Sequence, residues 1–276
     1  MSLHPVSVGD LELVPIPDAV GLLAAYADVF PDVPPDAWEP FRALYPELFS
    51  GDDWRLPCKC FLVRSGGTTI LIDTGVGPPG LWDWTAEDEG RLPLALEDLG
   101  VQRDDVDIVF LTHLHIDHLG WNTDLEGVAF FPRARYVAHG DAVAFARARP
   151  ELAHIRRCVE PLVGRIETIT SDIELAPGVN AFVSPGHHPG HMGLRLSSEN
   201  GAAVLLADSA VYPALLHEPD SVYIADGDPA TCAATRRLLL PELVDRDVLV
   251  ACGHYPGSGI GRVVTRDGRV VWEEAH

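Results

Sequence analysis

Residues 113–118 read His-Leu-His-Ile-Asp-His, and this run decides how the rest of the chain is interpreted. Buried polar side chains are costly without partners, so a cluster of imidazoles and a carboxylate needs an explanation. Imidazole nitrogens and carboxylate oxygens are ligands of zinc and of other borderline divalent metals. The run offers four candidate metal ligands: His113, His115, Asp117 and His118. The alternative is a histidine-rich loop that holds no metal.

The segment before this run, residues 105–112, is apolar and rich in β-branched side chains (Asp-Val-Asp-Ile-Val-Phe-Leu-Thr). Such a pattern predicts a buried strand. The candidate ligands therefore begin where a strand ends and a loop starts, which is where open α/β sheets carry their sites.

The composition excludes several classes of partner. The chain has 276 residues, of which 47% are hydrophobic, and a net charge of −21 with Lys59 as its only lysine. Nucleic-acid binding and adsorption to anionic membranes both need a basic face, so neither is expected. Divalent cations would offset some of this charge locally, although the acidity can equally serve solubility alone.

No stretch approaches the roughly 20 apolar residues of a membrane span. The first residues, Met-Ser-Leu-His-Pro, lack the basic and apolar regions of a signal peptide, so we expect a cytoplasmic protein. An odd number of cysteines in such a chain argues against a disulfide framework. We expect five buried thiols: Cys58, Cys60, Cys158, Cys232 and Cys252.

Residues 18–57 differ in character from the rest of the chain, because aromatic side chains alternate there with prolines. This pattern predicts short helices or turns and not a pair of strands. Two roles stay open for the segment: a satellite core, or a cap whose aromatic side chains line the path of a substrate. We expect residues 1–276 to form a single domain that includes it.

A weak internal repeat organises the remaining chain. A predicted hairpin, an aspartate, a helix and a strand that ends in a histidine occur twice, with Asp73 and His113 in the first half and Asp208 and His254 in the second. Two such halves would stack two sheets face to face and bring both histidine-bearing strand ends to one rim. The repeat thus predicts that His113 and His254 meet, although chance similarity of short β-rich segments is an alternative.

A second histidine cluster lies at residues 184–191, Ser-Pro-Gly-His-His-Pro-Gly-His. Its glycines and prolines predict a fixed loop after a strand. Not every histidine of this loop is expected to bind a metal. Asp208 follows an apolar strand as a lone carboxylate, which is costly unless it is paired or metal-bound.

Together these motifs resemble the metallo-β-lactamase fold superfamily. The matching stretches are Leu-Ile-Asp-Thr-Gly at 71–75, the run at 113–118, Pro-Gly-His-His-Pro-Gly-His at 185–191, Ala-Asp at 207–208 and Gly-His at 253–254. The resemblance implies an αββα sandwich of two mixed β-sheets with helices on the outer faces.

The resemblance also implies a site for two divalent metal ions, with Zn²⁺ as the expected metal. His113, His115 and His191 would hold the first ion, Asp117, His118 and His254 the second, and Asp208 would bridge them. Asp73 would orient a ligand or its loop. His187 corresponds to a histidine of the loop motif that does not bind metal, so it is left out. Side chains two apart on an extended segment point the same way, which agrees with His113 and His115 sharing one ion.

Among the branches of the superfamily, the ligands favour lactonases and hydrolases of organophosphates and carboxyl esters. His115 stands where the di-iron branch has Glu, and Asp208 where the secreted lactamases have Cys. We therefore expect a dinuclear hydrolase whose metal-bridging hydroxide opens a small uncharged ester, most plausibly a lactone. Asp117 is the candidate for proton transfer to the leaving group. Tyr212, or less favourably Tyr255, is a candidate to bind the carbonyl oxygen, and a tyrosine that only packs in the core is the alternative.

Three alternatives remain open at this stage. The same fold could hydrolyse a phosphotriester, an aryl ester or a thioester, because only the pocket decides the substrate. A non-catalytic metal-binding protein is less favoured. The expected partner is a small apolar or uncharged molecule, and a homodimer is left open.

Overall fold

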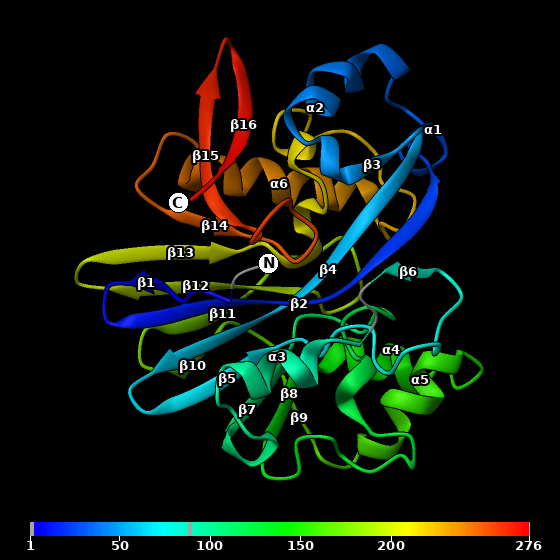
Figure 1. Ribbon diagram of the computed structural model, residues 1–276, viewed down its shortest axis with the longest axis vertical. Coiled ribbons are helices and arrows are strands. Elements are labelled where there is room, and N and C mark those ends of the chain that lie inside the picture. Colours follow the sequence, from blue (N-terminus) through cyan, green and yellow to red (C-terminus); the bar gives the residue numbers. More distant parts are fainter. Residues whose placement is uncertain (1–2, 88–89, 276) are drawn as a thin grey trace.

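The computed structural model describes residues 3–87 and 90–275. Two mixed β-sheets pack face to face, with helices on both outer faces (Figure 1). The first sheet has the order β1-β2-β4-β5-β7-β8-β9, with β3 paired to β4 and β6 to β2, and the second has the order β10 to β16. The fold predicted from the sequence, a sandwich of two mixed sheets with outer helices, is confirmed.

The strands of the first sheet are β1 (Val6–Val8), β2 (Leu11–Ala25), β3 (Phe49–Ser50), β4 (Asp53–Ser65), β5 (Thr68–Ile72), β6 (Thr85–Glu87), β7 (Ile108–Leu111), β8 (Arg135–His139) and β9 (Ile166–Ile169). Those of the second are β10 (Ile173–Ala176), β11 (Val179–Val183), β12 (Met192–Ser198), β13 (Gly201–Leu205), β14 (Leu249–Ala251), β15 (Ile260–Arg266) and β16 (Arg269–Glu274).

The α-helices are α1 (Tyr26–Val29), α2 (Glu39–Leu44), α3 (Leu92–Asp98), α4 (Gly140–Arg147), α5 (Ala153–Cys158) and α6 (Pro229–Leu243). Short 3₁₀ helices are η1 (Pro35–Trp38), η2 (Pro46–Leu48), η3 (Arg103–Asp105), η4 (Gly120–Asn122), η5 (Glu160–Leu162), η6 (Ala207–Ala210) and η7 (Pro213–Leu216). In the described part of the chain, no helix has the length and hydropathy that a membrane span requires.

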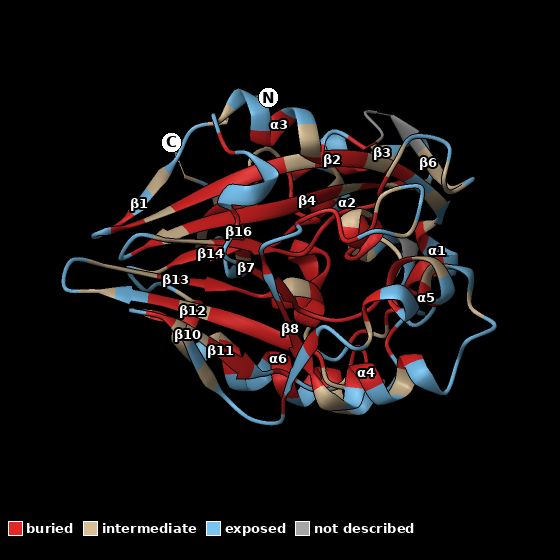
Figure 2. Ribbon diagram, turned by 90° about the horizontal axis from the view of Figure 1, so that it is seen from below, coloured by how far each residue is buried: buried red, intermediate tan, exposed pale blue. Residues whose placement is uncertain are grey.

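Three layers of buried side chains hold the sandwich together, and both sheets are largely buried (Figure 2). On β7, Ile108 and Phe110 face the second sheet, while Val109 and Leu111 pack beneath α3, α4 and α5. A strand that is buried on both faces has a continuous run of apolar residues, which is why the sequence of residues 105–112 predicted a buried strand. All five cysteines are buried free thiols, as predicted.

The internal repeat is present in the structure. The β4–β5 hairpin leads through α3 to β7, which pairs in parallel with β5. The β12–β13 hairpin leads through α6 to β14, which pairs in parallel with β13. The loops after β7 and β14 consequently meet, and both His113 and His254 lie beside the carboxylate of Asp208.

The prediction for residues 18–57 is wrong at both ends of the segment and correct in the middle. β2 continues to Ala25 and β4 begins at Asp53, and the two strands pair here, for example Val20 with Pro57. A bulge between Pro17 and Ala19 lets the ladder continue past proline, which cannot donate to it. Between the strands, α1, η1, α2 and η2 form the expected short helices.

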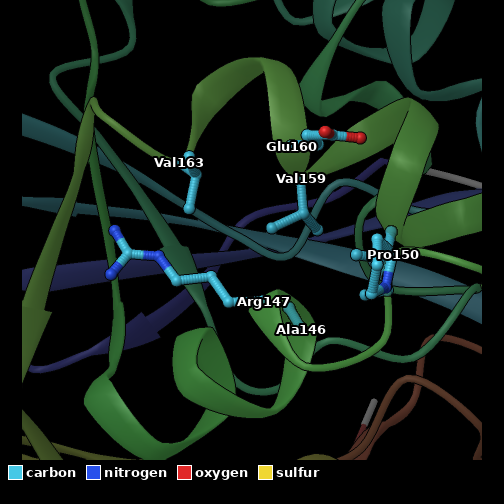
Figure 3. Close-up of a pocket in the computed structure, with 7 residues that line it drawn as sticks. Ala146, Arg147, Pro150, Val159, Glu160 and Val163 are labelled. Carbon is cyan, nitrogen blue, oxygen red and sulfur yellow. The ribbon is translucent and has the colours of Figure 1, made fainter.

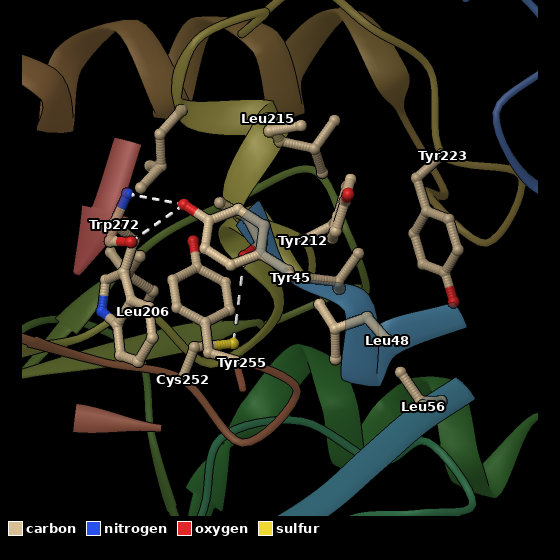
Figure 4. Close-up of a cluster of buried hydrophobic side chains, with 14 of the residues drawn as sticks. Tyr45, Leu48, Leu56, Leu206, Tyr212, Leu215, Tyr223, Cys252, Tyr255 and Trp272 are labelled. Atoms are coloured by element: carbon tan, nitrogen blue, oxygen red, sulfur yellow. Dashed lines mark hydrogen bonds between the residues drawn. The ribbon is translucent and has the colours of Figure 1, made fainter. Parts of the chain in front are cut away.

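Aromatic side chains of this middle part join the core on the outer face of the second sheet. Tyr26 and Trp38 pack around Tyr212, and the hydroxyl of Tyr45 bonds both backbone groups of Trp272 at 2.9 Å (Figure 4). The aromatic segment is thus packed into the main body of the protein, while Leu23 and Leu56 at the adjoining strand ends line a pocket.

Asp18 fixes the loop that follows β5. Its buried carboxylate accepts hydrogen bonds from the backbone N–H of Val76 at 2.6 Å and of Leu92, the first residue of α3, at 2.8 Å. Burial nevertheless raises the pKa of Asp18 to about 6, because desolvation of the charge outweighs these bonds.

This pKa predicts a pH dependence of stability. Between the unfolded value of 3.8 and about 6, the unfolded chain has released the Asp18 proton while the folded chain keeps it, so stability falls as pH rises through this window. The loss reaches roughly 3 kcal/mol at about 1.4 kcal/mol per pKa unit. Denaturant unfolding of the wild type and of Asp18→Asn at pH 4 to 7 measures it as the difference between the two proteins. A difference that does not change with pH would contradict the prediction.

Candidate metal centre

Four loops converge at one rim of the sandwich: the loop after β7, the loop between β11 and β12, η6 after β13, and the loop after β14. Each loop follows a buried strand, so the sheet fixes where its side chains begin. The cluster that they form contains His113, His115, Asp117, His118, His187, Asp208 and His254.

The carboxylate of Asp208 lies between two groups of these side chains. Its Oδ2 is 3.2 Å from Nε2 of His187 and 3.7 Å from Nε2 of His113. Its Oδ1 is 3.5 Å from Nε2 of His118 and 3.3 Å from Nε2 of His254. One oxygen therefore faces each group.

The group around Asp208 Oδ1 has the dimensions of a metal site. Asp117 Oδ2 lies 3.5 Å from His118 Nε2 and 3.4 Å from His254 Nε2. An ion with four tetrahedral bonds of about 2.0–2.1 Å holds its ligand atoms about 3.3–3.4 Å apart. Asp208 Oδ1 and His118 Nε2 are buried and have no hydrogen-bond partner, as expected of atoms that bind a cation.

The group around Asp208 Oδ2 is similar and slightly tighter. Nδ1 of His115 lies 3.1 Å from Nε2 of His113 and 2.9 Å from Nε2 of His187. Three imidazoles and one carboxylate oxygen again form a set of four, which suits zinc or a related divalent ion.

The electrostatics of the cluster favour bound cations. Burial lowers the pKa of His113 and of His115 well below the usual value, so both are neutral, the form that binds metal. Burial also acts to lower the pKa of His254, but Asp208 and Asp117 raise it well above the usual value. The two buried carboxylates thus draw positive charge into the site, which metal ions would supply.

The histidines on the Asp208 Oδ1 side are oriented by oxygen atoms behind them. Nδ1 of His118 bonds Asp73 Oδ2 at 2.8 Å, and Asp73 also accepts from the N–H and hydroxyl of Thr112. Nδ1 of His254 donates to the carbonyl of Pro57 at 2.7 Å. These bonds direct each Nε2 toward Asp208. Asp73 is thus hydrogen-bonded to a candidate ligand, the position that the resemblance implied for it.

Lys59 clamps the loop that carries His254. Its buried ammonium donates to the carbonyl of Tyr255 at 2.6 Å and to that of Gly253 at 3.3 Å. Burial lowers the pKa of Lys59 to about 8. The single lysine of the chain thus supports the backbone on both sides of one candidate ligand.

The structure brings His187 into the cluster and leaves His191 beside it. Nδ1 of His187 donates to Asp226 Oδ1 at 2.9 Å, which leaves Nε2 free to face Asp208. In His191, Nε2 accepts the backbone N–H of Asp208 at 3.0 Å and Nδ1 donates to the carbonyl of Ser184 at 2.9 Å, so both ring nitrogens are engaged. Nε2 of His187, and not that of His191, therefore faces the carboxylate of Asp208, whereas the sequence-based expectation was His191.

The signal that distinguishes the two histidines lies far along the chain. His187 and His191 each end a Pro-Gly-His tripeptide, so the local pattern is the same. They differ because Asp226, 39 residues beyond His187, receives the Nδ1 proton of His187 alone. Nothing in the motif itself reveals that partner.

A pocket of about 320 Å³ opens onto the cluster. Three of its lining residues, His115, Asp117 and Asp208, belong to the cluster. The other lining residues are mostly apolar: Leu23, Leu56, Trp84, Ile116, His154, Tyr223 and Ala225. A second cavity, of about 190 Å³, lies between α4 and the α5–η5 region and contains none of the cluster residues (Figure 3). A mostly apolar pocket with a few polar groups at one end is typical of a small-molecule site.

Neither tyrosine favoured by the sequence reaches this pocket. Tyr212 is fully buried among the aromatic side chains of the outer core, and Tyr255 is fully buried against Trp272. Tyr223 lines the pocket instead, and its ring lies parallel to that of His187, with the two ring centroids 5.9 Å apart. No local pattern marks Tyr223, because its position depends on the path of the loop after η7.

The family model described as "Metallo-beta-lactamase superfamily" matches residues 53–254. N-acyl homoserine lactonase AiiA of Bacillus thuringiensis subsp. kurstaki is 28% identical over 221 residues, which are 75% of this chain and 84% of that protein. N-acyl homoserine lactonase AiiB of Agrobacterium fabrum is 32% identical over 192 residues, 59% of this chain and 66% of that protein.

Solved structures share the fold over nearly the whole chain. The structure of AidC, a dizinc quorum-quenching lactonase in complex with a product, superposes with a TM-score of 0.85 at 21% identity, covering 99% of this chain and 97% of that one. The hydrolase AbOPH superposes with a TM-score of 0.84 at 23% identity and the same coverage.

The choice between His187 and His191 predicts different losses of metal affinity. If His187 is a ligand, His187→Ala should weaken Zn²⁺ binding by more than about 100-fold, beyond the 10- to 100-fold typical of residues behind a ligand. His191→Asn removes only an acceptor for the Asp208 N–H and should weaken binding far less. Competition with a chromophoric chelator measures both affinities. A larger loss in His191→Asn would reverse the assignment.

Proposed function

Because the chain belongs to the metallo-beta-lactamase superfamily and is a metal-dependent hydrolase, we propose that it uses two divalent ions to open a lactone. The observation that most supports two ions is the position of Asp208, because each of its two carboxylate oxygens faces a separate group of candidate ligand atoms. A single carboxylate placed in this way is suited to bridge two ions. His113, His115 and His187 would complete one site, and Asp117, His118 and His254 the other.

When bound, a pair of divalent ions would supply a nucleophilic hydroxide at neutral pH and polarise the carbonyl of the substrate. The protein's own contribution is to hold the ligands in place and to shape the pocket. Asp117 lines the pocket and is the group placed to pass a proton to the leaving alkoxide. Tyr223, on the His187 side of the pocket, is placed to donate a hydrogen bond to the carbonyl oxygen of the substrate.

The lining of the pocket supports an uncharged substrate. Among the described lining residues there is no lysine or arginine, while two carboxylates face the opening. An anionic substrate would find no lysine or arginine among these described lining residues to pair with. Leu23, Leu56 and Ile116 offer apolar surface to a hydrocarbon chain. The names of the relatives, N-acyl homoserine lactonases, support a lactone with such a chain.

A turnover screen tests the proposal. The wild type, loaded with Zn²⁺, should hydrolyse N-acyl homoserine lactones faster than an aryl ester, a thioester or a phosphotriester. Asp208→Ala should lower kcat/KM by at least about 10³-fold, because the bridge between the two groups of ligands is lost. Glu242→Gln, which alters a partly exposed ion pair with Arg195, serves as the control, because neither residue lines the pocket or belongs to the cluster. Turnover of the phosphotriester alone would favour an organophosphate hydrolase instead.

The role of Tyr223 predicts a matched pair of variants. Tyr223→Phe should lower kcat/KM for the lactone by about 2- to 12-fold, because it removes one hydrogen bond worth about 0.5–1.5 kcal/mol. Tyr212→Phe should leave kcat/KM unchanged, since Tyr212 is buried among aromatic side chains and does not line the pocket. Steady-state kinetics measure both. Equal losses in the two variants would contradict the assignment to Tyr223.

A further inference from the structure

Arg236 of α6 is a fully buried arginine whose guanidinium donates four hydrogen bonds. Its Nε donates to the carbonyl of Ser209 at 2.8 Å, and its Nη1 to the carbonyls of Ser221 at 2.7 Å and Pro219 at 3.0 Å. Its Nη2 donates to Asp226 Oδ2 at 2.5 Å. Buried guanidinium groups are rare and costly unless they are paired in this manner, so this arrangement requires an explanation.

Asp226 connects the guanidinium to the metal centre. Its side chain is 1% exposed, and while Oδ2 accepts from Arg236, Oδ1 accepts from Nδ1 of His187. This acceptor favours a proton on Nδ1, which would leave Nε2, 3.2 Å from Asp208 Oδ2, available to bind a metal ion. Arg236 in turn fixes the carboxylate plane of Asp226.

The same guanidinium also binds the backbone of two further segments, one next to Asp208 and one next to Tyr223. Ser209, whose carbonyl it binds, directly follows Asp208. Ser221, whose carbonyl it also binds, lies two residues before Tyr223 in the loop that forms one wall of the pocket. One side chain therefore contacts the segments that carry Asp208, Tyr223 and the partner of His187.

We propose that Asp226 and Arg236 are positioning residues: Asp226 sets the affinity of the His113–His115–His187 site for its metal, and Arg236 additionally fixes the pocket wall at 219–226. This inference rests on the proposed function, because it assigns a separate affinity to one of two metal sites. It predicts that the two residues affect different measurable quantities, whereas a merely structural ion pair would alter only stability.

The two variants should therefore differ in a defined way. Asp226→Asn keeps the volume and an acceptor oxygen but removes the charge, so it should weaken one of the two Zn²⁺ affinities by about 10- to 100-fold and leave the other unchanged. Its KM should stay within about twofold of the wild type when Zn²⁺ is saturating. Arg236→Lys lacks the fork that reaches Ser221 and Pro219, so it should weaken the same Zn²⁺ affinity and also raise KM.

Stepwise Zn²⁺ titration against a chromophoric chelator, together with steady-state lactone kinetics and unfolding midpoints, provides the test. Glu242→Gln is the matched control, because Glu242 lies on the same helix and pairs with Arg195 at 2.7 Å outside the centre. If Arg236→Lys does not fold, the two Zn²⁺ affinities of Asp226→Asn test the proposal without it. The proposal is overturned if Asp226→Asn keeps both wild-type Zn²⁺ affinities, or if it loses both equally. A wild type that binds no second Zn²⁺ would instead overturn the proposed function, and this inference with it.

Discussion

The structure depends on one buried anion, the carboxylate of Asp208. A carboxylate removed from water is unstable unless opposite charge and hydrogen-bond donors surround it. Four histidines reach its two oxygens from three different loops, and the backbone N–H of Asp208 is itself bound by His191. Even the neighbouring backbone is constrained, because Ala207 adopts a φ of 45° and Cys252 donates to its carbonyl. The sandwich brings these distant segments to a single point.

Much of the architecture was predictable because it depends on local patterns. The buried strand before His113 has an apolar run, and both halves of the repeat have a hairpin, a helix and a parallel strand, so the meeting of His113 and His254 followed from the order of the elements. The pairing of the distal parts of β2 and β4 was not predictable in the same way. It depends on a bulge that accommodates Pro17, and a bulge has no sequence signature of its own.

The candidate site was predictable only where a ligand belongs to a dense motif. His113, His115, Asp117 and His118 stand in six residues, and their clustering was recognisable. His187 is oriented by Asp226, 39 residues further along the chain, and Tyr223 lies in a loop that Arg236 holds through the carbonyl of Ser221. Tertiary partners of this kind decide which of two histidines in the same local pattern faces the carboxylate of Asp208, and the sequence motif alone does not reveal them.

The position of Lys59 has a consequence for the chemistry of the whole surface. It is the only lysine of the chain, and its amine is buried between β4 and the loop after β14, where it donates to two carbonyls. Reagents that couple to lysine amines, such as common cross-linkers and fluorescent esters, therefore find no lysine target on the folded protein. Acylation of Lys59 would occur only when the contact between the two sheets opens. The rate at which Lys59 is acylated would therefore report how often that contact opens.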